Sequence, residues 1–292
     1  MNNSKKLKEM VKAKEIAVLP GAYDALTAKL VQQAGFKAVY MSGSAITASR
    51  LGMPDVGMIY GTEMIEGART VARAVDVPVM ADGDTGYGDN KTVYRSVKEY
   101  IDAGISGIQL EDQPLSKKCG HMAGKKVVPV EEMIKRIRAA QIARKEMGDE
   151  DFQLAIRSDA RAVEGFQETI DRCKAYAEAG ADIVFPVGLH SVDEYKQFLA
   201  TATAPVMIDI VENSNVPYLT YQELQDLGFS LVIYPLGGIF GAINSFRAMY
   251  KELKETGITK KAAVNMITFA TYNEILGEDA VNKLENAIEG IE

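Results

Sequence analysis

Acidic side chains follow the ends of two neighbouring strand-like runs. Asp82 and Asp84 end one run and are two residues apart, so on an extended chain both point to the same side. Glu111 and Asp112 end the next run. Carboxylates crowded together without a cation repel one another and raise one another's pKa. A hard divalent ion relieves this repulsion, so the pattern predicts a Mg²⁺ site, with Mn²⁺ as the alternative ion. Solvated loop acids or helix caps are the competing interpretation.

A cysteine lies in the loop that follows, residues 117–121, with the sequence Lys-Lys-Cys-Gly-His. Nearby positive charge favours a thiolate, so we expect the pKa of Cys119 to be lowered. Such a thiol can act as a general acid–base or as a nucleophile, and Gly120 would let the loop move. A free cysteine can also be a small buried hydrophobe, which is how we interpret Cys173 in its helical segment.

A further basic side chain, Arg157, ends the fifth strand-like run. Its guanidinium group matches a substrate carboxylate, and a structural salt bridge to one of the same acids is the alternative. The two histidines, His121 and His190, do not have metal-ligand spacing, which excludes a histidine-rich zinc site. No serine lies in a Gly-x-Ser-x-Gly sequence, so a hydrolase of that kind is not indicated.

Short β-branched runs alternate with amphipathic stretches, and this alternation must position the residues above. The strand-like runs are residues 16–19, 38–42, 78–82, 107–112, 153–158, 182–186, 205–210 and 231–235. Helical patterns cover residues 22–35, 61–75, 91–104, 130–148 and 167–180. Several helical stretches end at a glycine suited to a left-handed cap: Gly35, Gly104, Gly148, Gly180 and Gly228.

Eight nearly continuous apolar strands predict a parallel sheet covered by helices, and eight such units in roughly 240 residues predict an α/β fold of the (β/α)8 TIM barrel type. The acids, the cysteine loop and Arg157 would then meet at one mouth. No Gly-x-Gly-x-x-Gly sequence follows a strand, which argues against an open doubly wound sheet. No linker divides the chain, so we expect residues 1–292 to form a single barrel domain. Surplus helices at about 239–292 would pack on a neighbouring subunit.

The amino-acid composition of the chain excludes several classes of binding partner. The 292 residues carry a formal net charge of −7 without an offsetting basic stretch, which argues against nucleic-acid binding. There are two cysteines, no signal-peptide pattern and no apolar run of roughly 18 residues. We therefore expect a cytoplasmic protein that acts on a small molecule, not at a membrane.

Together these motifs resemble the isocitrate lyase/phosphoenolpyruvate mutase superfamily, specifically its methylisocitrate lyase-like branch. The resemblance covers about residues 20–236. The segments that match the sequence motifs of the superfamily are residues 42–44, 51–55, 82–88, 111–113, 117–121 and 157–159. In this superfamily the Lys-Lys-Cys-Gly-His sequence marks the carbon–carbon lyases. It therefore favours a lyase over a phosphonate mutase or an oxaloacetate-type hydrolase or decarboxylase.

The resemblance implies a role for each matching residue. Asp84 would bind Mg²⁺ directly, whereas Asp82, Asp55 and Glu111 would act mostly through bound waters. It also implies a homotetramer whose subunits exchange the eighth helix. The substrate-binding set it implies is Ser42, Gly43, Ser44, Asp82, Lys118, Gly120, His121, Arg157, Asp209 and Glu212.

The implied reaction is retro-aldol cleavage of a 2-hydroxy acid. Cys119 would protonate the carbanion carbon, and Mg²⁺ and the basic residues, Arg157 among them, would stabilise the developing negative charge. Glu111 is counted with the catalytic residues through the metal site. Tyr40 is the candidate for the base that deprotonates the hydroxyl. Closure of loop 117–121 would exclude water before cleavage.

Two positions depart from the tricarboxylate-specific lyases of this superfamily. Val187 stands where a glutamate is usual, and Asp209 where an asparagine is usual. An aspartate would repel an additional carboxylate unless it were protonated or paired. We therefore favour cleavage of a dicarboxylate, 2,3-dimethylmalate, to pyruvate and propanoate. The alternatives are a 2-methylisocitrate lyase that yields pyruvate and succinate, the hydrolase, decarboxylase or mutase above, and a barrel that binds a metabolite without catalysis.

Overall fold

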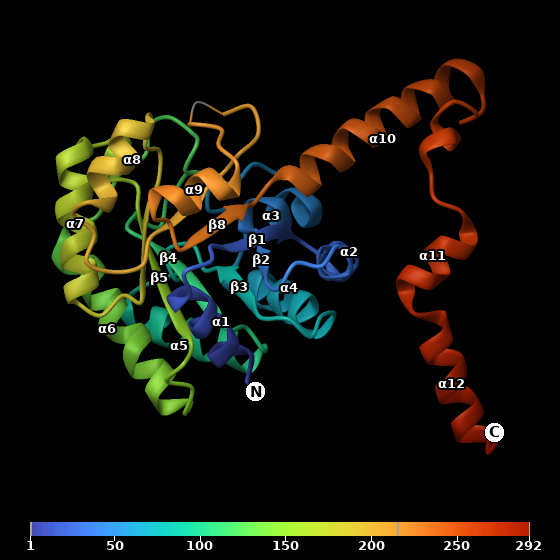
Figure 1. Cartoon of the computed structure of the whole chain (residues 1–292), viewed down its shortest axis with the longest axis horizontal. Helices are drawn as coiled ribbons and strands as arrows, with labels where there is room; N and C mark the ends of the chain where they lie inside the picture. Colours follow the sequence, from blue (N-terminus) through green and yellow to red (C-terminus); the bar gives the residue numbers. More distant parts are fainter. Residues whose placement is uncertain (1, 215, 292) are drawn as a thin grey trace. The chain divides into compact units, whose positions relative to one another are not determined.

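Eight parallel strands form one sheet in the computed structural model, which describes residues 2–214 and 216–291 (Figure 1). Their order is β6-β5-β4-β3-β2-β1-β8-β7, and a parallel bridge between Val184 and Val206 joins the two edges. The predicted (β/α)8 barrel is therefore confirmed. The strands are β1 (Ala17–Ala22), β2 (Val39–Met41), β3 (Val79–Asp82), β4 (Gly107–Glu111), β5 (Gln153–Ser158), β6 (Ile183–Pro186), β7 (Met207–Asp209) and β8 (Leu231–Tyr234).

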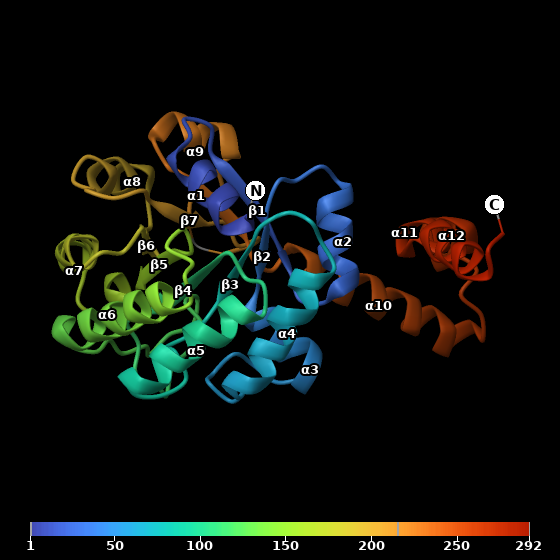
Figure 2. The same cartoon turned by 90° about the horizontal axis from the view of Figure 1, so that it is seen from below.

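Helices cover the outside of the sheet, as Figure 2 shows for α4 to α7. In α5 the side chain of Asp89 caps the first turn, and the buried Val93, Val97 and Tyr100 recur at helical spacing toward the core. The helices of this part of the chain are α1 (Asn3–Lys12), α2 (Ala25–Gln33), α3 (Gly43–Leu51), α4 (Gly61–Arg73), α5 (Asn90–Asp102), α6 (Val130–Glu146), α7 (Phe166–Glu178), α8 (Val192–Leu199) and α9 (Tyr221–Leu227).

The interior of the barrel is a packed core. Side chains from alternating strand positions, such as Leu19, Met80 and Met207, form one buried cluster. Leu7 and Val11 of α1 join it, although the polar N-terminal segment did not predict a helix. The five glycines expected to be left-handed caps all have positive φ, from 69° to 110°. The apolar runs and the cap glycines of the sequence therefore predict where strands and helices lie.

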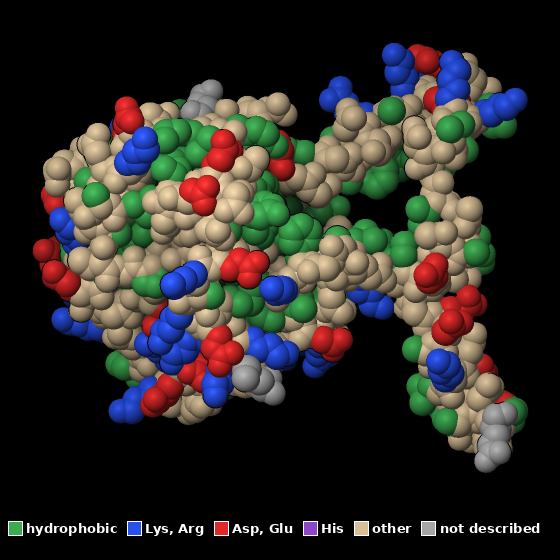
Figure 3. Space-filling view, viewed as in Figure 1, with side chains coloured by type: hydrophobic (Ala, Val, Ile, Leu, Met, Phe, Trp, Pro, Cys, Tyr) green, Lys and Arg blue, Asp and Glu red, His purple; other side chains and the backbone are tan. Residues whose placement is uncertain are grey.

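The described chain divides into two compact units, Met1–Gly237 and Gly238–Glu292. The second unit holds most of α10 (Gly237–Thr256), together with α11 (Phe269–Leu276) and α12 (Glu278–Glu289), and no residue of these three helices is buried. Figure 3 shows hydrophobic side chains along its surface. Among the described helices, none combines the length and apolar character needed to cross a membrane.

Candidate active site

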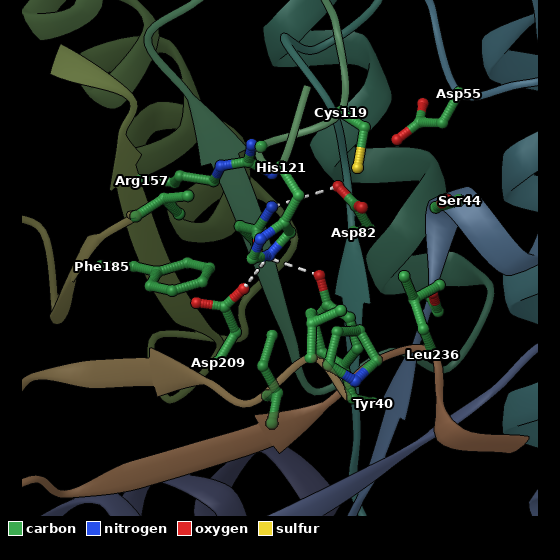
Figure 4. Close-up of a pocket in the computed structure, with 17 residues that line it drawn as sticks. Tyr40, Ser44, Asp55, Asp82, Cys119, His121, Arg157, Phe185, Asp209 and Leu236 are labelled. Carbon is green, nitrogen blue, oxygen red and sulfur yellow. Dashed lines mark hydrogen bonds and ion pairs between the residues drawn. The ribbon is translucent and has the colours of Figure 1, made fainter. Parts of the chain in front are cut away.

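A small cavity of about 40 Å³ lies where the strands end at the carboxyl side of the barrel (Figure 4). Parallel strands point their carboxyl ends to one edge, so residues far apart in sequence meet there. Most residues predicted for the site line it or lie beside it. The lining includes Tyr40, Ser42, Ser44, Asp55, Asp82, Cys119, Gly120, His121, Arg157 and Asp209.

Three buried carboxylates form a cluster beside this cavity. Oxygen atoms of Asp82, Asp84 and Glu111 lie within 4.8 Å of one another. Asp84 is not on an extended segment as predicted, because its φ of +48° places it in a turn after β3. Asp55 lies outside this cluster. Asp112 accepts hydrogen bonds from Ser158 and Tyr176 instead, so it belongs to a supporting network and not to the cluster.

Burial dominates the electrostatics of the cluster. Loss of solvation raises the pKa of Asp82 and raises that of Glu111 strongly. It raises the pKa of Asp84 from 3.8 to about 6, against the opposing effect of Lys117. In the described part of the chain, neither carboxylate oxygen of Glu111 accepts a hydrogen bond of good geometry, although Oε2 forms an ion pair with Arg157. Buried carboxylates of this kind require a compensating cation, so the cluster fits a divalent metal ion.

The ammonium group of Lys117 is also buried in this region and forms ion pairs with Asp55 and Asp84. Its pKa is raised well above the ordinary value, because the nearby carboxylates outweigh the opposing effect of burial. Lys117 therefore supplies positive charge to Asp84 and Asp55 from the cysteine loop. Lys118 points elsewhere, since its Nζ donates a hydrogen bond to the carbonyl of Ala123 at 3.2 Å.

The raised pKa of Asp84 predicts a pH-dependent effect of metal on stability. A carboxyl group whose pKa is higher in the folded chain contributes stability below its unfolded pKa, and this contribution is lost as the pH rises through about 6. A divalent ion such as Mg²⁺ would bind the ionised form and compensate for the loss. The rise in melting temperature on adding Mg²⁺ should therefore be larger at pH 8 than at pH 5, as measured by differential scanning fluorimetry. A rise independent of pH would contradict this assignment of Asp84.

Arg157 connects the acids to the cavity. Its Nη1 lies 3.0 Å from Oε2 of Glu111, and its Nη2 donates to Oδ1 of Asp159 at 3.0 Å. Burial alone would lower the pKa of Arg157, but Asp159 and Glu111 hold it well above its ordinary value. The alternative considered for Arg157, a structural salt bridge to one of the acids, is therefore present. The guanidinium group also lines the cavity, where it can meet a substrate oxygen.

The thiol of Cys119 faces the cavity from the loop after β4, and its backbone N–H donates to the carbonyl of Asp55 at 3.0 Å (Figure 4). The predicted lowering of its pKa was wrong. Burial, followed by the charge of Asp55, raises the pKa and outweighs the lowering effects of a backbone hydrogen bond from His121 and of the charges of Arg157 and Lys117. A thiol that stays protonated suits a proton donor better than a nucleophile.

Tyr40 belongs to a buried hydrogen-bonded chain. Its hydroxyl donates to Oε1 of Gln109 at 2.9 Å, and Nε2 of Gln109 donates to Asp82 at 3.2 Å. Burial, followed by the charge of Asp82, raises the pKa of Tyr40 well above 10.0. A tyrosinate base is therefore disfavoured, and Tyr40 is suited to donate a hydrogen bond. Gln109 was not predicted as a site residue, although it lies two residues before Glu111 on β4, so that both side chains point to the same side.

The remaining predicted residues divide between the cavity and its surroundings. The ring of His121 lies 2.7 Å from Oδ2 of Asp209 across the cavity (Figure 4). The loop 42–44 begins α3, and a Cβ on Gly43 would lie only 2.8 Å from Asp82, so glycine permits this close approach. Glu212 is not among the residues that line the cavity. Its carboxylate lies beside Gly237.

Comparison with known proteins gives concordant results. The model of the family described as phosphoenolpyruvate phosphomutase matches residues 7–254. The chain is 40% identical to 2,3-dimethylmalate lyase of Eubacterium barkeri, over 98% of each chain. It is 37% identical to 2-methylisocitrate lyase of Aeropyrum pernix, over 93% of this chain and 86% of that one. A solved structure of oxaloacetate acetylhydrolase with the inhibitor 3,3-difluorooxalacetate superposes with a TM-score of 0.94 at 34% identity, covering 100% of this chain and 98% of that one.

Proposed function

The chain belongs to the phosphoenolpyruvate mutase/isocitrate lyase superfamily and is a carbon–carbon lyase, and we propose that it cleaves 2,3-dimethylmalate to pyruvate and propanoate with a divalent metal ion. The observation that carries this proposal is the uneven charge of the cavity wall. Among the described residues that line the cavity, Arg157 and His121 are the two whose side chains can carry a positive charge. The imidazole of His121 already contacts the carboxylate of Asp209.

Apart from Asp209 and His121, this cavity has several apolar lining residues: Phe185, Val187, Val211 and Leu236. One oxygen of Asp209, Oδ1, is buried without a hydrogen-bond partner in the described chain. An additional substrate carboxylate would meet this oxygen and no free cation, whereas a methyl group would meet apolar atoms. This favours dimethylmalate over methylisocitrate, which has one carboxylate more.

The metal ion would be held by Asp82, Asp84 and Glu111, whose buried oxygens fit a hard cation. When bound, it supplies Lewis acidity toward the 2-hydroxyl and the adjacent carboxylate of the substrate. Arg157 binds substrate oxygens, and the serine loop 42–44 holds the carboxylate of the pyruvate half. Tyr40 donates a hydrogen bond from its hydroxyl to Gln109, which in turn donates to Asp82. These groups fix the substrate with its C2–C3 bond toward Cys119.

Cleavage breaks the bond between C2 and C3 of dimethylmalate. The hydroxyl gives its proton to a water molecule and becomes the carbonyl of pyruvate, and the electron pair of the C2–C3 bond moves into the enolised carboxylate of the other fragment. The thiol of Cys119 then gives its proton to that carbon, which yields propanoate. The resulting thiolate regains a proton from solvent when the loop opens. The raised pKa of Cys119 supports this order, because the thiol is protonated at neutral pH.

The substrate is tested by measuring pyruvate release from 2,3-dimethylmalate and 2-methylisocitrate in parallel, first with Mg²⁺ and then with EDTA. We expect metal-dependent turnover of dimethylmalate and little turnover of methylisocitrate. A preference for methylisocitrate would keep the lyase chemistry and overturn the substrate assignment. No pyruvate from either compound would contradict the proposal, and oxaloacetate would then be the next compound to test.

We also propose that residues 239–292 pack on a neighbouring subunit of a homotetramer. The helices of this unit bury none of their described residues, and α10 exposes Phe240, Phe246 and Tyr250. Apolar surface of this extent is typical of an interface. Light scattering should give the mass of four chains, and Phe246→Asp should lower it, whereas Lys254→Ala on the same helix should not. A monomeric parent protein would refute this proposal.

A further inference from the structure

We infer that Gln113, Lys125 and Asp159 form a brace that fixes the backbone on both sides of Cys119 and ties it to Arg157. These three residues were not assigned a role from the sequence. They do not touch the reacting atoms, so they are positioning residues. The significance of the brace for catalysis rests on the proposed role of Cys119 as proton donor.

Gln113, which follows β4, holds the residue before the cysteine. Its Nε2 donates to the carbonyl of Lys118 at 2.8 Å, and its Oε1 accepts the backbone N–H of Lys118 at 3.0 Å. Both backbone groups of one loop residue are thus bonded to one side-chain amide. Gln113 is itself buried, and its own carbonyl accepts a hydrogen bond from Arg136 at 2.8 Å. The amide is therefore a fixed point for the loop.

Lys125 holds the residue after the cysteine. Its Nζ donates to the carbonyl of Gly120 and to Oδ1 of Asp159, the latter at 2.9 Å. The side chain of Lys125 is only 2% exposed, although the neighbouring residues 121–124 and Lys126 are exposed. A buried ammonium group needs close partners, so Lys125 favours the loop conformation in which both acceptors are in reach.

Asp159 joins these two contacts to the substrate side of the cavity. One carboxylate oxygen accepts from Lys125 and from Nη2 of Arg157, and the other accepts from Nε2 of Gln113 at 3.0 Å. Gly120 packs directly on Arg157, because a Cβ there would lie 2.5 Å from Nη2. The guanidinium group that would bind substrate oxygens is thus bonded to the carboxylate that holds the loop. Arg157 and Cys119 are fixed relative to each other by shared hydrogen bonds.

A purely structural ion pair would also bury Lys125 beside Asp159, so the test must report on the loop itself. The alkylation rate of Cys119 by iodoacetamide does so, because its thiol is only partly exposed at the cavity, and movement of the loop away from the barrel would increase its access to the reagent. Cys173 provides an internal control, since it is buried at 3% exposure and would react only if the barrel opened. Peptide mass spectrometry separates the two sites.

Lys125→Met removes the hydrogen bonds of Lys125 to Gly120 and to Asp159, which hold the loop in place. We expect this loss to raise the alkylation rate of Cys119 by about tenfold or more, because the open form of the loop becomes more populated. The melting temperature should fall, because Asp159 loses one of its two cationic partners and keeps Arg157. The rate at Cys173 should not change while the barrel stays folded. Lys126→Met, at the exposed neighbour, should behave as the parent protein, and Lys125→Arg should restore most of the protection. The turnover number of Lys125→Met for dimethylmalate should fall in parallel.

An unchanged alkylation rate at Cys119 in a folded Lys125→Met variant would overturn the brace. If that variant does not fold, Gln113→Met is used instead, with the same acceleration expected and the same outcome decisive. The alkylation assay needs no substrate. Failure of the proposed lyase reaction would therefore appear as absent pyruvate release in the parent protein, independently of the result for the brace.

Discussion

Replacing Cys119 by serine is expected to lower pyruvate release from dimethylmalate by about 10²–10⁴-fold, the range that general acid–base groups contribute. A serine hydroxyl has nearly the same shape, but it is a much weaker acid than a thiol and does not protonate the leaving carbon. Binding of pyruvate should be retained, because the contacts proposed for its carboxylate come from Arg157 and the loop 42–44. Steady-state kinetics and calorimetric titration with pyruvate measure the two effects separately.

Cys173→Ser is the matched control, because Cys173 is buried in α7 and lies outside the cavity lining. It should keep its activity. A Cys119→Ser variant that retained most of its turnover would contradict the proton-donor role and would fit a hydrolase or a decarboxylase. The parent enzyme should also lose activity as the pH rises through the pKa of Cys119, which burial raises above its ordinary value of 9.0, since the donor is then deprotonated.

Replacing Asp84 by asparagine is expected to weaken Mg²⁺ binding strongly. Substitution of residues that only support a metal ligand weakens metal binding by roughly 10–100-fold, and the loss of a ligand should have a larger effect. The change removes one charge from the three clustered carboxylates. Turnover at a fixed Mg²⁺ concentration should fall by a similar factor and recover partly when Mg²⁺ is raised. Isothermal titration of the metal-free protein measures the affinity without reference to activity.

The stability of this variant distinguishes a metal effect from a folding defect. Because burial already raises the pKa of Asp84 to about 6, a neutral side chain is expected to keep the melting temperature of the metal-free protein near that of the parent. The Mg²⁺-induced rise should be lost. Asp193→Asn, at an exposed position of α8, is the surface control. Unaltered Mg²⁺ affinity in Asp84→Asn would mean that the acidic cluster does not hold the metal ion.

The sequence by itself determined the barrel. Each apolar run is buried by its own composition, and each cap glycine is selected by its own φ, so strands and helix ends could be located from local signals. Because parallel strands end at one edge, the convergence of Asp82, Glu111 and Arg157 also followed from the sequence. The N-terminal α1 did not, because its apolar residues Leu7 and Val11 are few and gain their burial only from the assembled barrel.

Only the tertiary structure decided the charges and contacts within the site. The lysines beside Cys119 in the chain predicted a lower thiol pKa, but Lys117 turns to Asp55 and Asp84, and burial raises the pKa instead. Asp112 leaves the acidic cluster because consecutive strand residues face opposite sides. The pair of Lys125 with Asp159 joins residues 34 positions apart. Such contacts depend on how separate loops meet above the barrel, which spacing along the chain does not encode.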